Sequence, residues 1–323
     1  MARVLIAGTG ALGSVFGGLL RLSGHAVTLL GRAAYLDAVA TQGLSIDGLW
    51  GEHHASGFDL YTDAATLNGT FDAILVTVKS YATQAMARAL APVLVRGGVI
   101  VSLQNGLGNA EALEAAVGPG RVLAGRVIFG AETMAPGRVR VTVYAEPVLV
   151  GAWSDEVRQA TDGQEAQAHQ LADSFAAAGI PSEFCDDIQS ALWGKVLYNA
   201  ALNPLGALLG VHYGALSEDA NTRAVMDVTI DEAFAVAVAE GARLPWPSSA
   251  AYRAVFYDRL VPSTFHHRSS MLQDLERGRP TEIDAINGAV WRRGQARGIV
   301  TPVNELLTRL MHAREAVGEG SSR

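Results

Sequence analysis

The feature that most constrains this chain is a glycine-rich segment close to its N-terminus. A short apolar run over residues 4–7 ends directly before it, and a helical pattern over residues 11–22 begins within it. The segment consists of Gly8, Thr9, Gly10, Ala11, Leu12 and Gly13. In this setting the first glycine permits a tight turn, the second lets the backbone approach a pyrophosphate, and the third lets the helix pack on the strand. The helix N-terminus adds free N–H groups and partial positive charge, so the pattern predicts dinucleotide binding rather than a turn that merely connects.

Strand and helix patterns alternate through the first half of the chain. Short apolar runs typical of buried strands occupy residues 4–7, 27–30, 73–78, 99–102 and 122–128. Helical patterns occupy residues 11–22, 82–94, 109–117 and 164–178. This alternation predicts an α/β Rossmann-type domain with a mostly parallel, doubly wound sheet. Residues 44–50 and 139–150 look more antiparallel, and we expect them to be strands added at the edges of that sheet.

The pattern of hydrophobic residues changes after Cys185, where runs typical of strands become rare. Helical patterns separated by prolines and glycines occupy residues 187–209, 222–240, 248–259, 265–276, 283–297 and 302–316. The length of 323 residues also fits two domains, at about 150 residues for each. We therefore expect a Rossmann-like nucleotide-binding domain over residues 1–186 and an all-α domain over residues 187–323.

Composition excludes several other classes of protein. Hydrophobic residues make up 49% and charged residues 18%, which is typical of a globular protein and not of a disordered one. The net charge of −7, without a cluster of lysine and arginine, argues against a nucleic-acid partner. The single cysteine excludes an intramolecular disulfide, and we find neither a targeting signature nor an apolar run of about 18 residues. We expect a cytoplasmic protein without a membrane partner.

The second apolar strand points to the kind of dinucleotide. It ends in Leu30 and Gly31, without the Asp or Glu that usually binds the ribose 2′-hydroxyl of NAD, and Arg32 follows. A guanidinium suits the 2′-phosphate of NADP, so we predict NADPH, although a surface arginine in a loop is the alternative. Lys79 and Asn105 follow two later strands, at the carboxyl edge where ligands bind in such sheets. Asn105 precedes a glycine, and turn chemistry explains it equally well.

A polar pattern interrupts the first predicted helix of the second half. Lys195, Asn199 and Asn203 are spaced four residues apart among apolar neighbours, so they lie within about 80° of each other on the helix. A stripe that faces solvent is the simplest interpretation, but the flanking residues leave little else to face solvent. Polar groups in such surroundings need partners. Burial lowers the pKa of a lysine, because it disfavours the charged form, and a lysine with a lowered pKa can act as a general acid near neutral pH.

A second polar cluster spans residues 269–274 and 281–284. Thr281 is a candidate N-cap for the helix expected over residues 283–297, with Asp284 at the capping-box position. Glu282 would then lie in the first turn, where the helix dipole stabilises negative charge.

Together these segments resemble the ketopantoate reductase (2-dehydropantoate 2-reductase) family over nearly the whole chain. The matching residues are 8–13, 76–79, 104–108, 195–204, 269–274 and 281–288. The glycine turn is shared with many enzymes, whereas the Lys–Asn–Asn helix and the runs Ser-Ser-Met-Leu-Gln-Asp and Thr-Glu-Ile-Asp are far more specific. The resemblance implies an NADPH-dependent reduction of ketopantoate to (R)-pantoate, a step toward pantothenate and coenzyme A, in a cleft between the two domains.

The resemblance also implies roles for individual residues. Lys195 would be the general acid, and Glu282 would help to set the site and contact the cofactor near its nicotinamide ribose. Asn105 would lie near nicotinamide and substrate, while the substrate hydroxyl and carboxylate would be held by Asn199, Asn203 and Ser270. The adenosine and ribose side of NADPH would face Arg32 and Lys79, and Ala131 would make a backbone contact to the cofactor.

Two positions depart from the family pattern and leave the substrate open. Members often carry Asn-Gly where this chain has Tyr213-Gly214, and some carry Asn where this chain has His267. A reductase of another branched 2-oxo acid is therefore an alternative, and a non-catalytic NADPH sensor is a further one. The pairs His53-His54 and His266-His267 suggest a metal, but hydride transfer from NADPH needs none, and we expect none. A monomer and a homodimer both remain open.

Overall fold

The computed structural model describes residues 1–154 and 160–320. Contacts within the chain group these residues into two units. The first contains Met1–Gln104 and Asn109–Ile188, and the second contains Asn105–Gly108 and the residues from Gln189 onward. The assignment of four residues near position 105 to the second unit is a feature that the sequence pattern does not reveal.

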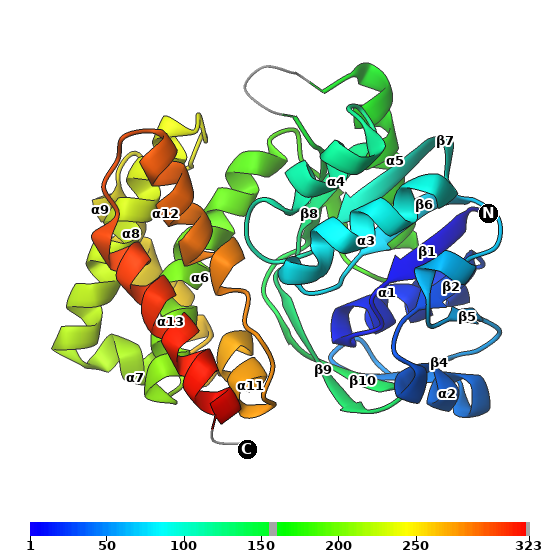
Figure 1. Cartoon of the computed structure of the whole chain (residues 1–323), viewed down its shortest axis with the longest axis horizontal. Coiled ribbons are helices and arrows are strands. Elements are labelled where there is room, and N and C mark those ends of the chain that lie inside the picture. The colour runs from blue at the N-terminus through cyan, green and yellow to red at the C-terminus, as the bar shows by residue number, and fades with distance from the viewer. Residues whose placement is uncertain (155–159, 321–323) are drawn as a thin grey trace. The chain divides into compact units, whose positions relative to one another are not determined.

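The first unit is built on a mostly parallel sheet of eight strands, in the order β12-β11-β8-β7-β6-β1-β2-β5 (Figure 1). The strands are β1 (Arg3–Ala7), β2 (Ala26–Leu30), β5 (Asp59–Tyr61), β6 (Phe71–Val76), β7 (Leu94–Ser102), β8 (Val122–Arg126), β11 (Val148–Ala152) and β12 (Ser182–Phe184). Each neighbouring pair in the run β8-β7-β6-β1-β2-β5 is parallel. Strand β11 is antiparallel to β8 and parallel to β12.

Helices cover both faces of this sheet. They are α1 (Ala11–Leu22), α2 (Ala33–Gln42), α3 (Thr83–Leu90), α4 (Asn109–Val117) and α5 (Asp162–Ala177). Helices α3 and α4 contact each other on the face toward the viewer in Figure 1, while α1 contacts α5. The predicted doubly wound Rossmann-type fold is confirmed.

A second sheet of four strands, in the order β4-β3-β10-β9, corrects one prediction. It contains β3 (Leu44–Gly48), β4 (His53–Ala55), β9 (Phe129–Ala135) and β10 (Arg138–Tyr144). Residues 44–48 and 138–144 therefore lie in the second sheet and not at an edge of the main sheet, and the pairing of β3 with β10 is parallel. Residues 148–150 belong to β11 of the main sheet, which is antiparallel to β8 as expected. Pro147 lies between β10 and β11 and divides the predicted run into strands of different sheets, because proline cannot donate to a ladder.

Helix α1 packs between the two sheets, and its glycines explain how. A Cβ on Gly17 would lie 2.9 Å from Leu29 of the main sheet, whereas a Cβ on Gly18 would lie 2.7 Å from Ile46 of the second sheet. Neighbouring glycines thus let one helix approach strands on two sides. This double contact buries α1 and fixes the turn that precedes it.

The second unit is helical, as predicted. Its helices are α6 (Ile188–Leu209), α7 (Tyr213–Glu218), α8 (Ala220–Ala239), α9 (Ser249–Val255), α10 (Val261–Ser263), α11 (Ser270–Glu276), α12 (Asn287–Ala296) and α13 (Pro302–Gly320). Helix α7 was not predicted, and the helix expected over 265–276 begins only at Ser270. The helix expected over 283–297 is divided into a 3-10 turn (Ile283–Ala285) and α12.

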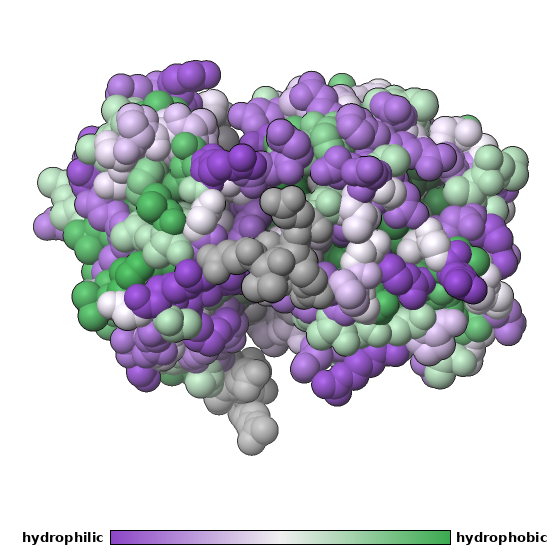
Figure 2. All heavy atoms as spheres, turned by 90° about the horizontal axis from the view of Figure 1, so that it is seen from above, coloured by the Kyte–Doolittle hydropathy of each residue, from purple (hydrophilic) through white to green (hydrophobic). Residues whose placement is uncertain are grey.

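The surface of the described residues is mixed in character. Figure 2 shows hydrophilic residues over most of one face, with hydrophobic residues in small groups between them. Among the described helices, none combines the length and the apolar character that crossing a membrane requires.

The glycine turn yields the first testable prediction. A Cβ on Gly13 would lie 2.0 Å from the carbonyl oxygen of Gly8, so the backbone must shift in Gly13→Ala. We expect the free energy of unfolding to fall by about 1–3 kcal/mol in urea titrations, the usual cost of overpacking. Gly10→Ala is the matched control, because a Cβ there meets nothing within 4 Å. Equal losses in both variants would contradict this account of the turn.

Candidate active site

The predicted cofactor residues of the first unit follow the carboxyl ends of adjacent parallel strands. Gly8 comes directly after β1, Arg32 follows β2, and Lys79 follows β6. The chain order reverses between β1 and β6, so this edge is the topological switch point at which such sheets bind ligands. The sheet order therefore brings the three positions to one edge, which we call the cofactor edge.

The glycine turn has the geometry that a phosphate requires. Gly8 has a φ of +113°, a conformation that favours glycine. Gly10 is the N-cap of α1 and makes no side-chain cap, and the space in front of it is open. Phosphate oxygens can therefore approach the backbone at Gly10 and accept from the free N–H groups in the first turn of α1.

Thr9 places Arg32 beside this turn. Its side chain is buried, and a Cβ on Gly31 would lie 1.8 Å from Thr9 Oγ1. Only glycine at position 31 lets β2 end this close to the turn, a contact that the sequence alone did not reveal. Arg32 itself is the exposed N-cap of α2. A guanidinium at this point is available to a phosphate on the ribose.

Gln104 ties two strand ends together at the cofactor edge. Its amide donates to the carbonyl of Val78 at 2.8 Å and to Thr83 Oγ1 at 2.6 Å. It thereby fixes the segment that carries Lys79, which is the half-buried N-cap of a 3-10 turn (Ser80–Ala82). Ala131 lies half-buried on β9, opposite Val141 in the second sheet. The cofactor contacts expected for Lys79 and Ala131 stay predictions.

In the second unit, Lys195, Asn199 and Asn203 lie on α6, and we call them the polar row. The solvent-facing alternative is wrong, because Asn199 is 7% exposed, Asn203 is 3% exposed and Lys195 is half-buried. Lys195 Nζ donates to Asn105 Oδ1 at 2.6 Å, and Asn105 Nδ2 donates to Glu282 Oε2 at 3.5 Å. The structure thus joins three predicted site residues in one chain of hydrogen bonds.

The loop of Asn105 is held by its glycine. Gly106 has a φ of +82°, and a Cβ there would lie 2.3 Å from the carbonyl oxygen of Ala285. That same carbonyl accepts from Leu107 N at 2.8 Å. The Asn-Gly pair is therefore both a turn and the support for a site residue, so the two interpretations left open by the sequence are compatible.

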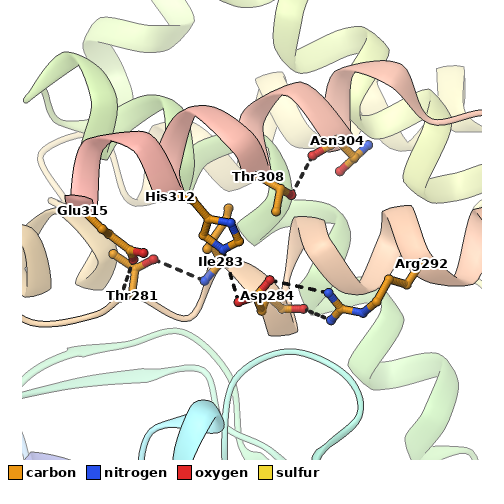
Figure 3. A network of polar contacts seen from close by, with 8 residues as sticks. All are labelled: Thr281, Ile283, Asp284, Arg292, Asn304, Thr308, His312 and Glu315. Atoms are coloured by element: carbon orange, nitrogen blue, oxygen red, sulfur yellow. Dashed lines mark hydrogen bonds and ion pairs between the residues drawn. The ribbon is translucent and has the colours of Figure 1, made fainter. Parts of the chain in front are cut away.

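Glu282 is 6% exposed. The residues on either side of it have partners that the sequence did not predict (Figure 3). Thr281 Oγ1 accepts from Ile283 N at 3.3 Å, as an N-cap would. The predicted capping box with Asp284 is wrong, because the N–H of Thr281 donates to Glu315 on α13 at 2.7 Å. Asp284 contacts Arg292 and His312 instead. The carboxylate of Glu315, which is distant in the sequence, thus accepts the hydrogen bond that was expected for Asp284.

Pro204 interrupts the hydrogen bonds of α6 directly beside the polar row. Proline has no N–H, so the carbonyl of Ala200, four residues earlier, loses its helical donor. Asn287 Nδ2 replaces that donor at 3.0 Å and also donates to Asn304 Oδ1 at 3.0 Å. Asn287 is fully buried. It therefore satisfies the carbonyl that lies between Asn199 and Asn203 in the helix.

Ser269 connects the far end of the polar row to α11. Its hydroxyl caps α11 by accepting from Leu272 N at 3.0 Å and donates to the carbonyl of Asn203 at 3.3 Å. The adjacent Ser270, a predicted substrate residue, is thereby placed near Asn203. Tyr213 Oη donates to Asn203 Oδ1 at 2.6 Å. Tyr213 thus contacts a predicted substrate residue.

The histidine pairs have local partners. His53 Nε2 lies 2.9 Å from the carbonyl oxygen of Trp50, and His54 Nδ1 lies 3.3 Å from Ser45 Oγ. The ring of His266 packs against Phe265, and the ring of His267 packs against Tyr213. Packing and local hydrogen bonds therefore give these pairs a structural role.

Family models match both halves of the chain. Residues 4–155 match the model described as ketopantoate reductase PanE/ApbA, and residues 187–315 match the model of the ketopantoate reductase PanE/ApbA C terminal. The chain belongs to the ketopantoate reductase family.

Curated relatives of the family match over almost their full length. The 2-dehydropantoate 2-reductase of Aquifex aeolicus is 37% identical over 315 residues, which cover 97% of each chain. The 2-dehydropantoate 2-reductase of Archaeoglobus fulgidus is 34% identical, over 97% of this chain and 98% of the relative.

Solved structures of similar chains agree in fold. A PanE/ApbA family ketopantoate reductase from Ralstonia eutropha matches with a TM-score of 0.85 and 34% identity, over 98% of this chain and 99% of the other. A D-mandelate dehydrogenase solved with NADH and anilino(oxo)acetate matches with a TM-score of 0.86 and 28% identity, over the same shares. Solved structures with a similar fold thus carry the names of enzymes that act on different compounds.

The pairing of Asn287 with the carbonyl freed by Pro204 yields the second prediction. Asn287→Leu removes the donor for Ala200 and for Asn304, and each buried acceptor left unpaired costs about 1–3 kcal/mol. We expect the free energy of unfolding, from urea titration, to fall by about 2–5 kcal/mol.

A double-mutant cycle provides the control. Pro204→Ala restores an N–H that bonds Ala200 within the helix, so Asn287→Leu then leaves only Asn304 unpaired. We expect the loss caused by Asn287→Leu to be smaller in that background by about 1–2 kcal/mol. Strictly additive losses would show that the two residues do not share this carbonyl.

Proposed function

We propose that this chain reduces ketopantoate to (R)-pantoate with NADPH, in the cytoplasmic synthesis of pantothenate and coenzyme A, as a monomer or a homodimer. The observation that carries the proposal is the hydrogen-bond chain of Lys195, Asn105 and Glu282, in a member of the ketopantoate reductase family. These three residues supply a proton donor and the groups that orient it. A glycine turn with open space at Gly10 supplies the place for the cofactor phosphates.

The chemistry requires a hydride at the carbonyl carbon and a proton at the carbonyl oxygen of a 2-oxo acid. NADPH, when bound, supplies the hydride. Lys195 donates a proton from Nζ to the oxygen, and its positive charge offsets the alkoxide that forms. The π bond of the carbonyl breaks while a C–H bond and an O–H bond form, and the C–O single bond remains. The neutral amine of Lys195 then regains its proton from water.

Lysine is the suitable residue for this step. Of the 25 lysine and arginine residues only two are lysines, Lys79 and Lys195. Arginine stays charged at any pH at which enzymes work and cannot release a proton, whereas lysine can. A sequence that otherwise uses arginine for its cations has thus kept an ionisable amine on the polar row.

Asn105 and Glu282 orient this amine. Asn105 accepts a proton of the Lys195 ammonium at 2.6 Å, and this hydrogen bond fixes the direction of the amine. The amide of Asn105 is turned the right way because its own N–H group faces Glu282. Asn199, Asn203 and Ser270 then bind the substrate hydroxyl and carboxylate.

Reduction of another branched 2-oxo acid is the alternative that a specific observation favours. Tyr213 and His267 occupy positions where family members often carry asparagine, and a structural relative is a D-mandelate dehydrogenase. The residues around Lys195 serve both substrates equally, since they act on the shared carbonyl. Rates across a panel of 2-oxo acids decide between the two.

The third prediction concerns the cofactor. Arg32 is exposed at the end of β2, where no acidic residue is present to bind a ribose 2′-hydroxyl. Charged hydrogen bonds contribute about 1.5–3 kcal/mol, so wild-type protein should bind NADPH about tenfold to a hundredfold more tightly than NADH. Arg32→Ala should lose this preference with little effect on NADH affinity, measured by fluorescence titration of both cofactors. Equal affinities in the wild type would exclude this role of Arg32.

The fourth prediction tests the function itself. Lys195→Ala should lower kcat for ketopantoate by at least about a hundredfold in an NADPH-oxidation assay, because proton donation and charge are both lost. NADPH affinity should persist, since the glycine turn and Arg32 are intact. Lys195→Arg keeps the charge without an acid and should remain impaired. A folded Lys195→Ala protein with near-normal kcat would remove Lys195 from the mechanism and favour a sensor.

A further inference from the structure

The two departures from the family pattern lie together in the second unit. The N–H of Tyr213 donates to the carbonyl of His267 at 3.1 Å, and the centres of their rings are 5.2 Å apart. The next residue, Gly214, donates to the carbonyl of Phe265 at 2.8 Å, and a Cβ there would meet the Phe265 ring at 2.5 Å. The position of Tyr213 is thus fixed by its backbone.

From this position the Tyr213 hydroxyl contacts the polar row. Tyr213 and Asn203 are each 3% exposed, and Oη donates to Asn203 Oδ1 at 2.6 Å. Burial raises the pKa of the Tyr213 hydroxyl well above its ordinary value, so the group keeps its proton and remains a donor. The Tyr213 hydroxyl therefore takes one of the two acceptor positions of Asn203 Oδ1 and fixes the direction in which the amide faces.

The other half of this amide remains available. Within the part of the chain that the structure describes, Asn203 Nδ2 has no hydrogen-bond acceptor, and the amide of Asn199 has no partner. The polar atoms of these two amides that lack a partner are not sealed from solvent, so a ligand can reach them and complete their hydrogen bonds. The Nδ2 group is thus the part of the Asn203 amide that lacks a partner and can donate to a substrate.

We propose that Tyr213 is a positioning residue that sets substrate specificity: it holds Asn203 as a donor, so the substrate group bound there must accept a hydrogen bond. This inference rests on the proposed function and defines the substrate class as 2-oxo acids with an oxygen acceptor remote from the carbonyl. An ammonium group at that place can only donate, so it would leave Asn203 Nδ2 without an acceptor and is disfavoured.

The place of Asn203 on the helix identifies the group that it binds. Asn203 is eight residues beyond Lys195, about 12 Å along the axis, and is the member of the polar row farthest from the proton donor. In ketopantoate the carboxylate is attached to the carbonyl carbon, whereas the hydroxyl is two carbons away. Of these two acceptors the hydroxyl oxygen lies farther from the carbonyl, so it is the one that we assign to Asn203.

Two substrates with the same carbon skeleton test this. Ketopantoate carries the hydroxyl, and 3,3-dimethyl-2-oxobutanoate carries hydrogen in its place. We expect the wild-type protein to prefer ketopantoate in kcat/KM. Tyr213→Phe keeps the ring but frees the Asn203 amide to turn, so this preference should fall about three- to tenfold, the value of one neutral hydrogen bond. The fall should come from KM for ketopantoate, with kcat/KM for the hydroxyl-free substrate within about twofold of wild type.

Tyr198→Phe is the matched control. Tyr198 is another largely buried tyrosine of the second unit, and its hydroxyl shares a hydrogen bond with Thr264 rather than with Asn203. Its ring also packs against Tyr213, with centres 5.8 Å apart. A general loosening of the tyrosine cluster would affect both variants, whereas the proposed role changes the substrate preference only in Tyr213→Phe.

The outcomes separate this inference from the proposed function. An unchanged preference in Tyr213→Phe, an equal loss with both substrates, or the same change in Tyr198→Phe would overturn the role of Tyr213 and leave the reductase intact. A wild-type protein that reduces both substrates equally would show that Asn203 does not bind the hydroxyl. A wild-type protein that reduces neither would refute the proposed function, and this inference with it.

Discussion

Burial of helix α6 is the constraint on which the candidate site depends. Its flanking side chains, among them Trp193, Val196 and Leu197, are withdrawn from water, and a polar group among them costs about 1–3 kcal/mol unless it is paired. A polar group at such a position is therefore stabilised by a partner from outside the helix, and three of them have one. Asn105 serves Lys195, Tyr213 serves Asn203, and Asn287 serves the carbonyl freed by Pro204. The requirement that makes α6 stable is the same one that orients its side chains.

The fold of the first unit could largely be predicted from the sequence, because the patterns that indicate it lie within short segments of the chain. The glycine segment, the apolar strands and the helix between them are contiguous, and the turn geometry at Gly8 follows from the residue type. The polar row was readable for the same reason, since a spacing of four residues on an apolar helix is visible in the sequence itself.

The features that could not be predicted depend on partners distant in the chain. The parallel pairing of β3 with β10 joins residues about 90 positions apart, and nothing in either segment specifies the other. The capping box at Asp284 had the right residue types, but Glu315 of α13 reached Thr281 instead. The donor for the Ala200 carbonyl comes from Asn287, although the need for one is visible in Pro204. Sequence thus predicts which groups need partners more reliably than which residues supply them.

The support of α6 extends well beyond the residues that would touch a substrate. Asn287 is bonded to Asn304, and the Asn304 side chain donates to the buried carboxylate of Glu232 at 2.8 Å. Glu232 also accepts from the backbone N–H groups of Val303 and Asn304 at the start of α13, where negative charge is favoured.

This chain of bonds runs from a carboxylate on α8, through α13 and α12, to a carbonyl of α6. Hydrogen bonds in such dry surroundings reinforce one another, so the register of α6 is set by three other helices. The contact of Tyr213 with Asn203 is separate from that chain and involves only side-chain atoms. The fold can therefore hold the proposed proton donor in place while the residues at the other end of the polar row change, which would let one scaffold accept different 2-oxo acids.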